Sequence, residues 1–160
     1  PCPCGYLGDR RRTCTCPPVQ VARYRRKISG PLLDRFDLLM EVPAVDPSIL
    51  ASAPAGECSA GIRERVMAAR QLQCSRYAGT PFRSNAALSG KALQRHCRLL
   101  PESRAILLRA VEDLALSPRA YDRYLKVART IADLEGRPDI QDSHLYEAVQ
   151  YRAFEHSLRE

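Results

Sequence analysis

The sequence contains no run of about 18 apolar residues, the length that a membrane-spanning helix needs. It opens without a secretory signal, so its seven cysteines do not indicate an extracellular disulfide framework. A phosphate-binding loop of the form Gly-x₄-Gly-Lys-Ser/Thr is also missing. Before Gly90 and Lys91, Asn85 stands at the first glycine position, and Ala92 replaces the hydroxyl residue. We therefore expect a cytoplasmic chain with no membrane partner that does not hydrolyse ATP by itself.

The 160 residues are 45% apolar and 27% charged, which favours one compact domain, or a small domain with a tail. Because the chain begins with Pro1 rather than Met, we interpret it as a piece of a longer protein. Its net charge of +7 is concentrated at one end, since residues 1–30 hold seven basic residues and one acid. Such a segment is either a solvated tail or a surface for an anionic partner such as nucleic acid.

Four of the cysteines form two Cys-x-Cys pairs near the start of the chain, Cys2 with Cys4 and Cys14 with Cys16. Residues 1–17 are rich in proline, glycine, cysteine and arginine and lack hydrophobic periodicity. Such a loop needs something other than a core to order it. Four thiolates can hold zinc in a tetrahedral site and fix the loop. The alternative is four reduced thiols in a flexible loop.

The rest of the chain has the patterns of a mainly helical protein. Helical composition begins after the prolines at 17–18 and is expected to stop at Gly30 and Pro31. Residues 38–43 are short, apolar and end at a proline, which predicts one buried strand whose partners lie outside this chain. Residues 44–58 read as an exposed linker. Further helices are predicted at 59–77 with Ser59 as N-cap, and at 88–98, 101–115, 118–135 and 141–156.

The helix at 118–135 has the clearest pattern. Ser117 suits the N-cap, Pro118 the first helical position and Gly136 the position after the helix. Apolar residues repeat at i, i+3, i+4 and i+7, which predicts one buried face. That face comprises Tyr121, Tyr124, Leu125, Ala128, Ile131 and Ala132. Two pairs of opposite charge are expected on the solvent side, Asp122 with Lys126 and Arg129 with Asp133.

Three arginines are candidates for phosphate contacts. Arg35 lies between two aspartates, so it either forms a structural salt bridge or reaches across a subunit boundary to a phosphoryl group. Arg119 lies in the first turn of its helix, where a cation costs a few tenths of a kcal/mol, up to about 1, unless an anion is bound. Arg123 follows one turn later. These two residues form either a phosphate site at the helix N-terminus or a solvent-exposed stripe.

A basic segment with an aromatic ring is the candidate for nucleic-acid binding. Its tyrosine would stack on a base while its neighbours meet phosphates, and the alternative is a solvated helix face. These residues are Arg23, Tyr24, Arg25, Arg26 and Lys27. The three histidines, His96, His144 and His156, lack metal-ligand spacing and are expected at the surface or its boundary.

Five stretches resemble the C-terminal portion of the magnesium-chelatase-like AAA+ ATPases of the ComM/YifB type, which are linked to bacterial competence. They are PCPCGYLGD at 1–9, RY at 23–24 with ISGPLLDRFD at 28–37, VP at 42–43, RER at 63–65 with AR at 69–70, and LSPRAYDRYLKVARTIADLEG at 116–136. The motifs HL at 144–145, EA at 147–148 and QYR at 150–152 are similar to the family's ending.

The resemblance implies a mainly α fold, with a helical AAA+ C-terminal lid bundle preceded by an incomplete edge of the AAA+ α/β core that includes one short strand near 38–43. Residues 1–43 would form the C-terminal end of the AAA+ core, and residues 59–160 would form the helical lid. Residues 44–58 would be the linker between them. Arg35 corresponds to the arginine finger, which acts in trans on the nucleotide of a neighbouring subunit. Arg119 corresponds to the sensor-2 arginine, which contacts the nucleotide of its own subunit, with Arg123 beside it.

We therefore expect the C-terminal part of an ATPase that forms a homo-oligomeric ring, uses ATP and Mg²⁺, and remodels DNA by branch migration during transformation. The chain alone is expected to be inactive, because in this family Walker A and Walker B precede the matching segment. Two other hypotheses stay open. One is a zinc-stapled basic module that binds nucleic acid without catalysis, and the other is a motor subunit of a metal-chelatase complex.

Overall fold

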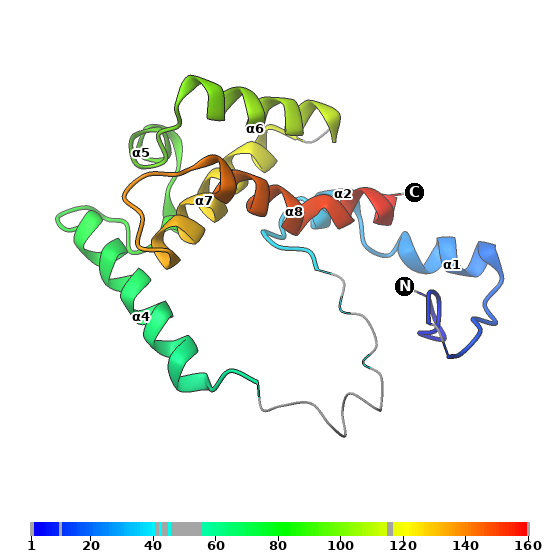
Figure 1. Ribbon diagram of the computed structural model, residues 1–160. Coiled ribbons are helices and arrows are strands. Elements are labelled where there is room, and N and C mark those ends of the chain that lie inside the picture. The colour runs from blue at the N-terminus through cyan, green and yellow to red at the C-terminus, as the bar shows by residue number, and fades with distance from the viewer. Residues whose placement is uncertain are drawn as a thin grey trace.

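The computed structural model of the chain describes residues 2–9, 11–40, 42, 45, 56–114 and 117–159, with side chains up to residue 151. Helices make up its body (Figure 1). They are α1 (Pro18–Arg25), α2 (Gly30–Leu33), α4 (Ser59–Arg76), α5 (Gly90–His96), α6 (Pro101–Asp113), α7 (Pro118–Leu134) and α8 (Asp142–Arg159), with the 3₁₀ turn η1 (Asn85–Ala87) before α5. The mainly α fold class is confirmed. Among the described helices, none has the length and apolar character to cross a membrane.

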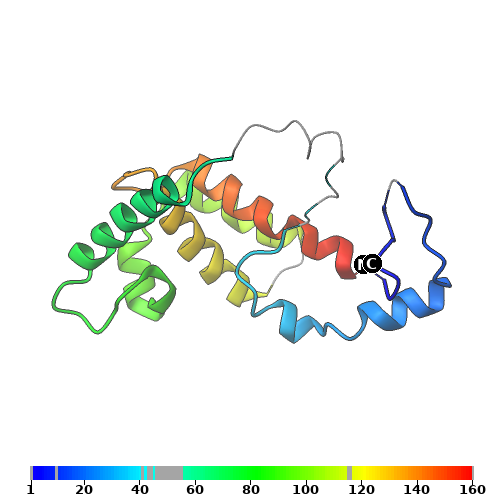
Figure 2. The ribbon, with the colours of Figure 1, turned by 90° about the horizontal axis from the view of Figure 1, so that it is seen from below.

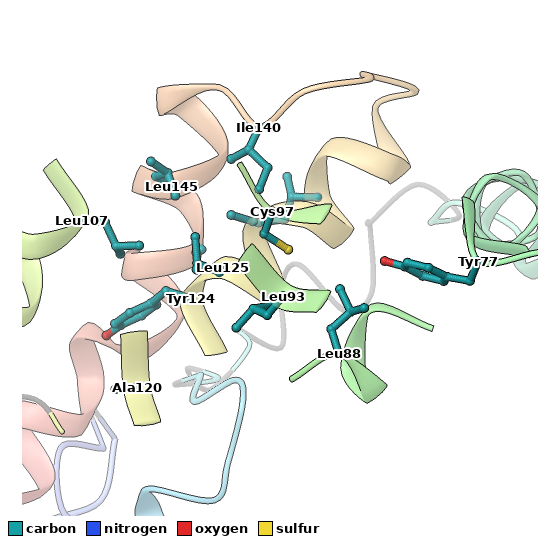
Figure 3. Packing of buried hydrophobic residues seen from close by; sticks show 13 residues of the cluster. Tyr77, Leu88, Leu93, Cys97, Leu107, Ala120, Tyr124, Leu125, Ile140 and Leu145 are labelled. Carbon is teal, nitrogen blue, oxygen red and sulfur yellow. The ribbon is translucent and has the colours of Figure 1, made fainter. Parts of the chain in front are cut away.

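Helix α7 lies at the centre of the bundle, because it contacts α4, η1, α5, α6 and α8. Its predicted apolar face is confirmed: Tyr124, Leu125, Ala128, Ile131 and Ala132 are buried, and Tyr121 packs against them half-buried. Figure 3 shows Tyr124 and Leu125 among side chains of the neighbouring helices, such as Leu107 and Leu145. Burial of each large apolar side chain contributes roughly 1.5–3 kcal/mol. The core of the bundle therefore forms around α7.

The two ends of α7 follow the predicted signals. Ser117 occupies the N-cap position with extended backbone, although its hydroxyl makes no capping hydrogen bond. At the other end Gly136 has a φ of +68°, a left-handed conformation that glycine adopts without strain. The Arg137 N–H then donates to the Ala132 carbonyl at 2.8 Å, and the Gly136 N–H to the Asp133 carbonyl at 3.1 Å. These bonds complete the helix end.

Several expected boundaries need correction. Gly30 and Pro31 do not merely stop a helix, because they begin the single turn of α2, where a proline suits the first positions. The preceding helix ends earlier than expected, at Arg25. Helix α4 has Cys58 at its N-cap, so Ser59 is its first residue.

The strand expected at 38–43 does not form in the described part of that segment, which covers residues 38–40 and 42. A strand needs the backbone of another strand beside it, and the described residues supply none. Instead the Leu39 N–H donates to the Tyr151 carbonyl of α8 at 2.8 Å. Residues 44 and 46–55 of the predicted linker lie outside the described residues.

The N-terminal loop and α1 lie beyond the helical bundle at one end of the molecule, as both views show (Figures 1 and 2). Residues 2–9 and 11–17 contain only turns and irregular backbone, as their composition predicts. No side chain of this loop belongs to the core cluster of the bundle. The loop is therefore ordered by contacts outside that core, which include a hydrogen bond from Arg11 Nη2 to the Val45 carbonyl at 2.7 Å.

Candidate functional site

Arg35 lines a groove between α4 and α7, which we call the α4–α7 groove. It has a volume of about 780 Å³, and the loop after α2 closes its side. Its lining includes Arg35, Asp37, Arg65, Arg123, Lys126 and Glu135 together with apolar side chains of α4 and α7. Arg35 is exposed, and its side chain bonds to none of the described residues. It is therefore free to reach a group outside this chain.

Arg123 is engaged within the chain. Its Nη1 donates to the Phe36 carbonyl at 3.1 Å, and its Nε lies 3.6 Å from Oδ1 of Asp37. Arg123 thus fastens the loop that carries Arg35 to the middle of α7. The structure brings Arg35 and Arg123 to one groove, whereas Arg119 does not line it.

Arg119 lies one residue after Pro118, in the first turn of α7. Its side chain is exposed and bonds to none of the residues that the structure describes. The four N–H groups that open a helix lack partners inside it, and the helix dipole makes this end positive. A cation in this turn is tolerated best when an anion offsets the repulsion. The geometry is compatible with a phosphate contact at Arg119.

The basic segment around Tyr24 occupies the end of α1 and the turn after it. Arg23, Arg26 and Lys27 are exposed, and Arg25 is half-buried. The Lys27 ammonium lies 5.5 Å from the centre of the Tyr24 ring, within the range of a cation–π contact. This places one aromatic face and several cations on a helix that projects from the bundle.

The structure gathers the four predicted cysteines into one cluster. Their sulfur atoms all lie within 4.8 Å of one another. Sγ of Cys2 is 3.3 Å from Sγ of Cys4, and Sγ of Cys14 is 3.6 Å from both. Cys2 is buried, and Cys4, Cys14 and Cys16 are half-buried. The four donors that a tetrathiolate metal site needs are therefore close together.

The two Cys-x-Cys pairs differ in acidity. A backbone hydrogen bond from Tyr6 lowers the pKa of Cys4 to about 6, although burial opposes the change. At Cys14 a backbone hydrogen bond at Cys16 acts to lower the pKa, but burial and the neighbouring thiols outweigh it and raise the pKa to about 12. Thiolate, not thiol, is the form that binds a metal. Cys4 thus supplies a thiolate readily near neutral pH.

A buried polar network around Asp133 is the feature that the sequence did not indicate. Arg129 and Asp133, expected on the solvent side of α7, are both buried, which corrects that prediction. Oδ2 of Asp133 accepts hydrogen bonds from Arg76 Nη1 and Asn85 Nδ2, each at 2.8 Å. Arg129 also donates to the carbonyls of Pro138 and Arg137 at 2.7 and 2.6 Å. The network joins α4, η1 and α7.

Hydrogen bonding determines the charge of this network. Burial alone would raise the pKa of Asp133, but hydrogen bonds from Arg76 and Asn85 and the charge of Arg129 lower it below its usual value. The bond with Asp133 raises the pKa of Arg76 in turn. The carboxylate is therefore ionised whenever the bundle is folded at neutral pH.

His144 is also fully buried, which corrects the expectation that it lies at the surface or its boundary. Its Nδ1 accepts the Gln141 N–H at 2.9 Å, and its Nε2 lies 3.0 Å from Oε2 of Glu135. The ring thus ties the end of α7 to the start of α8. Its spacing to the other histidines gave no hint of this role, because the partners are a backbone group and a carboxylate.

Comparison with known proteins now defines the class of this fold and site. Residues 1–50 match the family model described as "Magnesium chelatase, subunit ChlI", and residues 56–152 match "Magnesium chelatase, subunit ChlI C-terminal". The chain therefore belongs to the magnesium-chelatase family and is part of an AAA+-type protein. The helical bundle is the part that corresponds to the C-terminal model.

Within this class the chain is a member of the ComM/YifB type. It is 45% identical to "Competence protein ComM" of Haemophilus influenzae over 155 residues, 96% of this chain and 29% of that protein. It is 44% identical to "Uncharacterized protein YifB" of Salmonella typhimurium over 159 residues, 99% of this chain and 30% of that protein. A Mycobacterium bovis protein is 38% identical over 154 residues. The chain spans less than a third of the length of these curated relatives.

Proposed function

We propose that this chain supplies two phosphate-sensing arginines to a ring-forming AAA+ ATPase. Arg35 acts as the arginine finger toward the nucleotide of a neighbouring subunit, and Arg119 acts as the sensor-2 arginine toward the nucleotide of its own subunit. The observation that carries the proposal is that both side chains are exposed and bond to no described residue, within segments that the two family models match.

The chemistry of phosphoryl transfer explains why such arginines are needed. Negative charge spreads over the transferred group in the transition state, and a guanidinium offers several fixed N–H donors to it. ATP and Mg²⁺ belong to this proposal for the intact protein, because the segment that would cradle them is not in this sequence. Closure of the bundle over the nucleotide would then link the state of the nucleotide to the geometry of the ring.

DNA is the proposed substrate of the ring. The printed name of the Haemophilus relative places that protein in competence, and the end of α1 and the turn after it carry three exposed cations, Arg23, Arg26 and Lys27. Cations on a projecting helix bind a phosphate backbone by releasing its counterions. We propose that the ring couples ATP hydrolysis to DNA remodelling or branch migration.

The test is ATP turnover of the intact protein with Arg35→Ala or Arg119→Ala. Loss of an arginine finger should lower kcat by about 10³-fold or more. Loss of Arg119 should lower it by about tenfold or more, because one donor to developing charge is removed. Arg109→Ala is the matched control, since Arg109 is an exposed arginine on α6. Unchanged turnover in both test variants would contradict the proposed roles.

Adding DNA to the same assay distinguishes the substrates. Turnover stimulated by DNA supports a DNA motor, whereas turnover that responds only to a protein partner supports a chelatase-type motor. A second candidate is a zinc-stapled nucleic-acid-binding module without catalysis, which the cysteine cluster in the loop before basic α1 favours. That module would bind DNA as the isolated chain, with an affinity that falls steeply as salt rises.

A further inference from the structure

We infer that Cys2, Cys4, Cys14 and Cys16 form a structural zinc site that folds the N-terminal loop. The site stands on the positions of four sulfur atoms and does not depend on the proposed role in ATP hydrolysis. It would act as a staple for the N-terminal loop, whose described residues, 2–9 and 11–16, contribute no side chain to the apolar core. Zinc is the metal that suits four thiolates in a closed, tetrahedral arrangement.

The sulfur positions fit a tetrahedral site. With Zn–S bonds of about 2.3 Å, neighbouring sulfur atoms in a tetrahedron lie about 3.8 Å apart. Three of the sulfur–sulfur separations, among Cys2, Cys4 and Cys14, are 3.3 to 3.6 Å. Cys16 keeps its sulfur within 4.8 Å of the others. Small shifts of the side chains would bring all four to bonding distance of one ion.

The same separations do not describe disulfides. A disulfide has its sulfur atoms about 2.05 Å apart, so even the closest pair, at 3.3 Å, is not bonded. All four cysteines are free. Four free thiols packed against one another bury polarisable sulfur without gaining a bond, whereas a divalent cation between them would stabilise all four as thiolates.

The backbone around the first pair is shaped for ligation. The Gly5 N–H donates to the Cys2 carbonyl at 3.1 Å, which closes a turn over Pro3 and Cys4. Gly5 has a φ of +83°, which allows the chain to reverse directly after the second sulfur. The Leu7 N–H then donates to Sγ of Cys2 at 3.3 Å. Hydrogen bonds of this kind orient a metal ligand and stabilise its charge.

The loop that zinc would close carries an ordered cation. Arg12 Nη1 donates to the Tyr6 hydroxyl at 2.6 Å, and the Arg12 guanidinium lies 5.0 Å from the centre of the Tyr6 ring. The Asp9 carboxylate accepts the backbone N–H groups of Arg11 and Arg12 at 2.7 and 3.0 Å. All of these contacts lie between the two Cys-x-Cys pairs. The staple therefore fixes Tyr6 and Arg12 beside the basic helix α1.

The test is the metal content of the purified 160-residue chain and of its Cys14→Ser and Cys16→Ser variants. The parent chain should hold about one zinc per chain by elemental analysis. Each of the two variants should retain at least tenfold less zinc per chain than the parent. Cys58→Ser and Cys74→Ser are the matched controls, because both residues are exposed cysteines outside the cluster, and they should keep the parent's zinc.

Two further measurements make the outcome decisive. Co²⁺ added to the metal-free chain should give the absorption bands of a tetrahedral thiolate site, and these should be missing from Cys14→Ser. Circular dichroism should show the same helix content in all variants, since the loop lies outside the core cluster. A parent chain with no more zinc than Cys14→Ser, disulfides between these cysteines in mass spectrometry, or iron in place of zinc would overturn the inference.

Discussion

Asp133 shows how one buried carboxylate holds three elements of the bundle together. Its oxygens accept hydrogen bonds from Arg76 of α4, from Asn85 of η1 and from Arg129 one turn earlier on α7. The Arg129 and Asp133 side chains are almost completely buried. A charge taken from water into such a site costs several kcal/mol unless its partners compensate it. Removing the carboxylate would therefore leave two arginines without their counter-charge.

We predict that Asp133→Asn destabilises the bundle by about 3–5 kcal/mol, the range for breaking a buried ion pair on one side. Urea unfolding of the chain, followed by circular dichroism, measures the difference. Asp122→Asn is the matched control, because Asp122 lies exposed on the same helix and should change stability by no more than about 0.5 kcal/mol. Equal effects of the two substitutions would contradict the role of the network.

The same network gives stability a definite pH dependence. Because hydrogen bonds hold the pKa of Asp133 below its unfolded value of about 3.9, its contribution is fully present above that value. The contribution is lost as the pH falls through the lower pKa of the folded chain. The stability gap between the parent and Asp133→Asn should therefore stay constant from pH 7 to about pH 5 and narrow as the pH falls below about 4. A gap that stays constant over the whole range would assign the effect to packing rather than to charge.

The sequence could not place this network, for a physical reason. Opposite charges four residues apart stabilise a helix on any face, so the Arg129–Asp133 spacing does not say whether the pair is exposed. The decisive partner, Arg76, lies 57 residues away. By contrast, the two Cys-x-Cys pairs predicted their own cluster, because the same short loop carries both.

At the scale of elements, the loop after α2 is fastened to the bundle by few contacts. Arg123 holds the Phe36 carbonyl and lies 3.6 Å from Asp37, and the Leu39 N–H donates to the Tyr151 carbonyl of α8. Arg35 lies in the turn between α2 and these contacts. These contacts would let a movement of α7 reach Arg35 through Arg123. If Arg119 responds to nucleotide, the same helix carries that response to the arginine-finger loop.

We predict that Arg123→Ala in the intact protein lowers kcat for ATP about tenfold and leaves KM within about twofold. The reason is that Arg123 positions Arg35 by holding Phe36 and Asp37, rather than by binding ATP. Steady-state kinetics separate the two roles, because loss of a nucleotide contact would raise KM instead. Lys126→Ala is the control: Lys126 lines the same groove but donates to the Ala86 carbonyl, and its turnover should match the parent.

Elements with a strong local signal were predictable, and those that need distant partners were not. Helix α7 could be predicted together with both of its ends, because helix caps and periodicity act within a few residues. The apolar stripe from Tyr121 to Ala132 indicated the helix, and Pro118 and Gly136 indicated where it begins and ends. The apolar run at 38–43 predicted a strand, but a strand needs a neighbouring strand, which the described residues do not provide. Docking of Leu39 on α8 depends on a residue more than a hundred positions later.

At the scale of the whole molecule, Arg35 and Arg119 lie on different parts of one subunit, the loop after α2 and the N-terminal end of α7. In a ring of subunits joined head to tail, one face of each subunit meets the opposite face of the next. The proposal assigns Arg35 to the next subunit's nucleotide and Arg119 to its own. Each catalytic site would then contain arginines from two chains.

This division predicts that the two impaired variants restore each other. When Arg35→Ala and Arg119→Ala subunits are mixed equally and reassembled, an Arg35→Ala subunit keeps Arg119 for its own nucleotide and receives Arg35 from an Arg119→Ala neighbour. About a quarter of the junctions in randomly mixed rings pair this way, so turnover should recover to about a quarter of the parent's value. If both arginines served the same subunit's nucleotide, every site would lack one of them. Mixing would then restore nothing, and that result would refute action in trans.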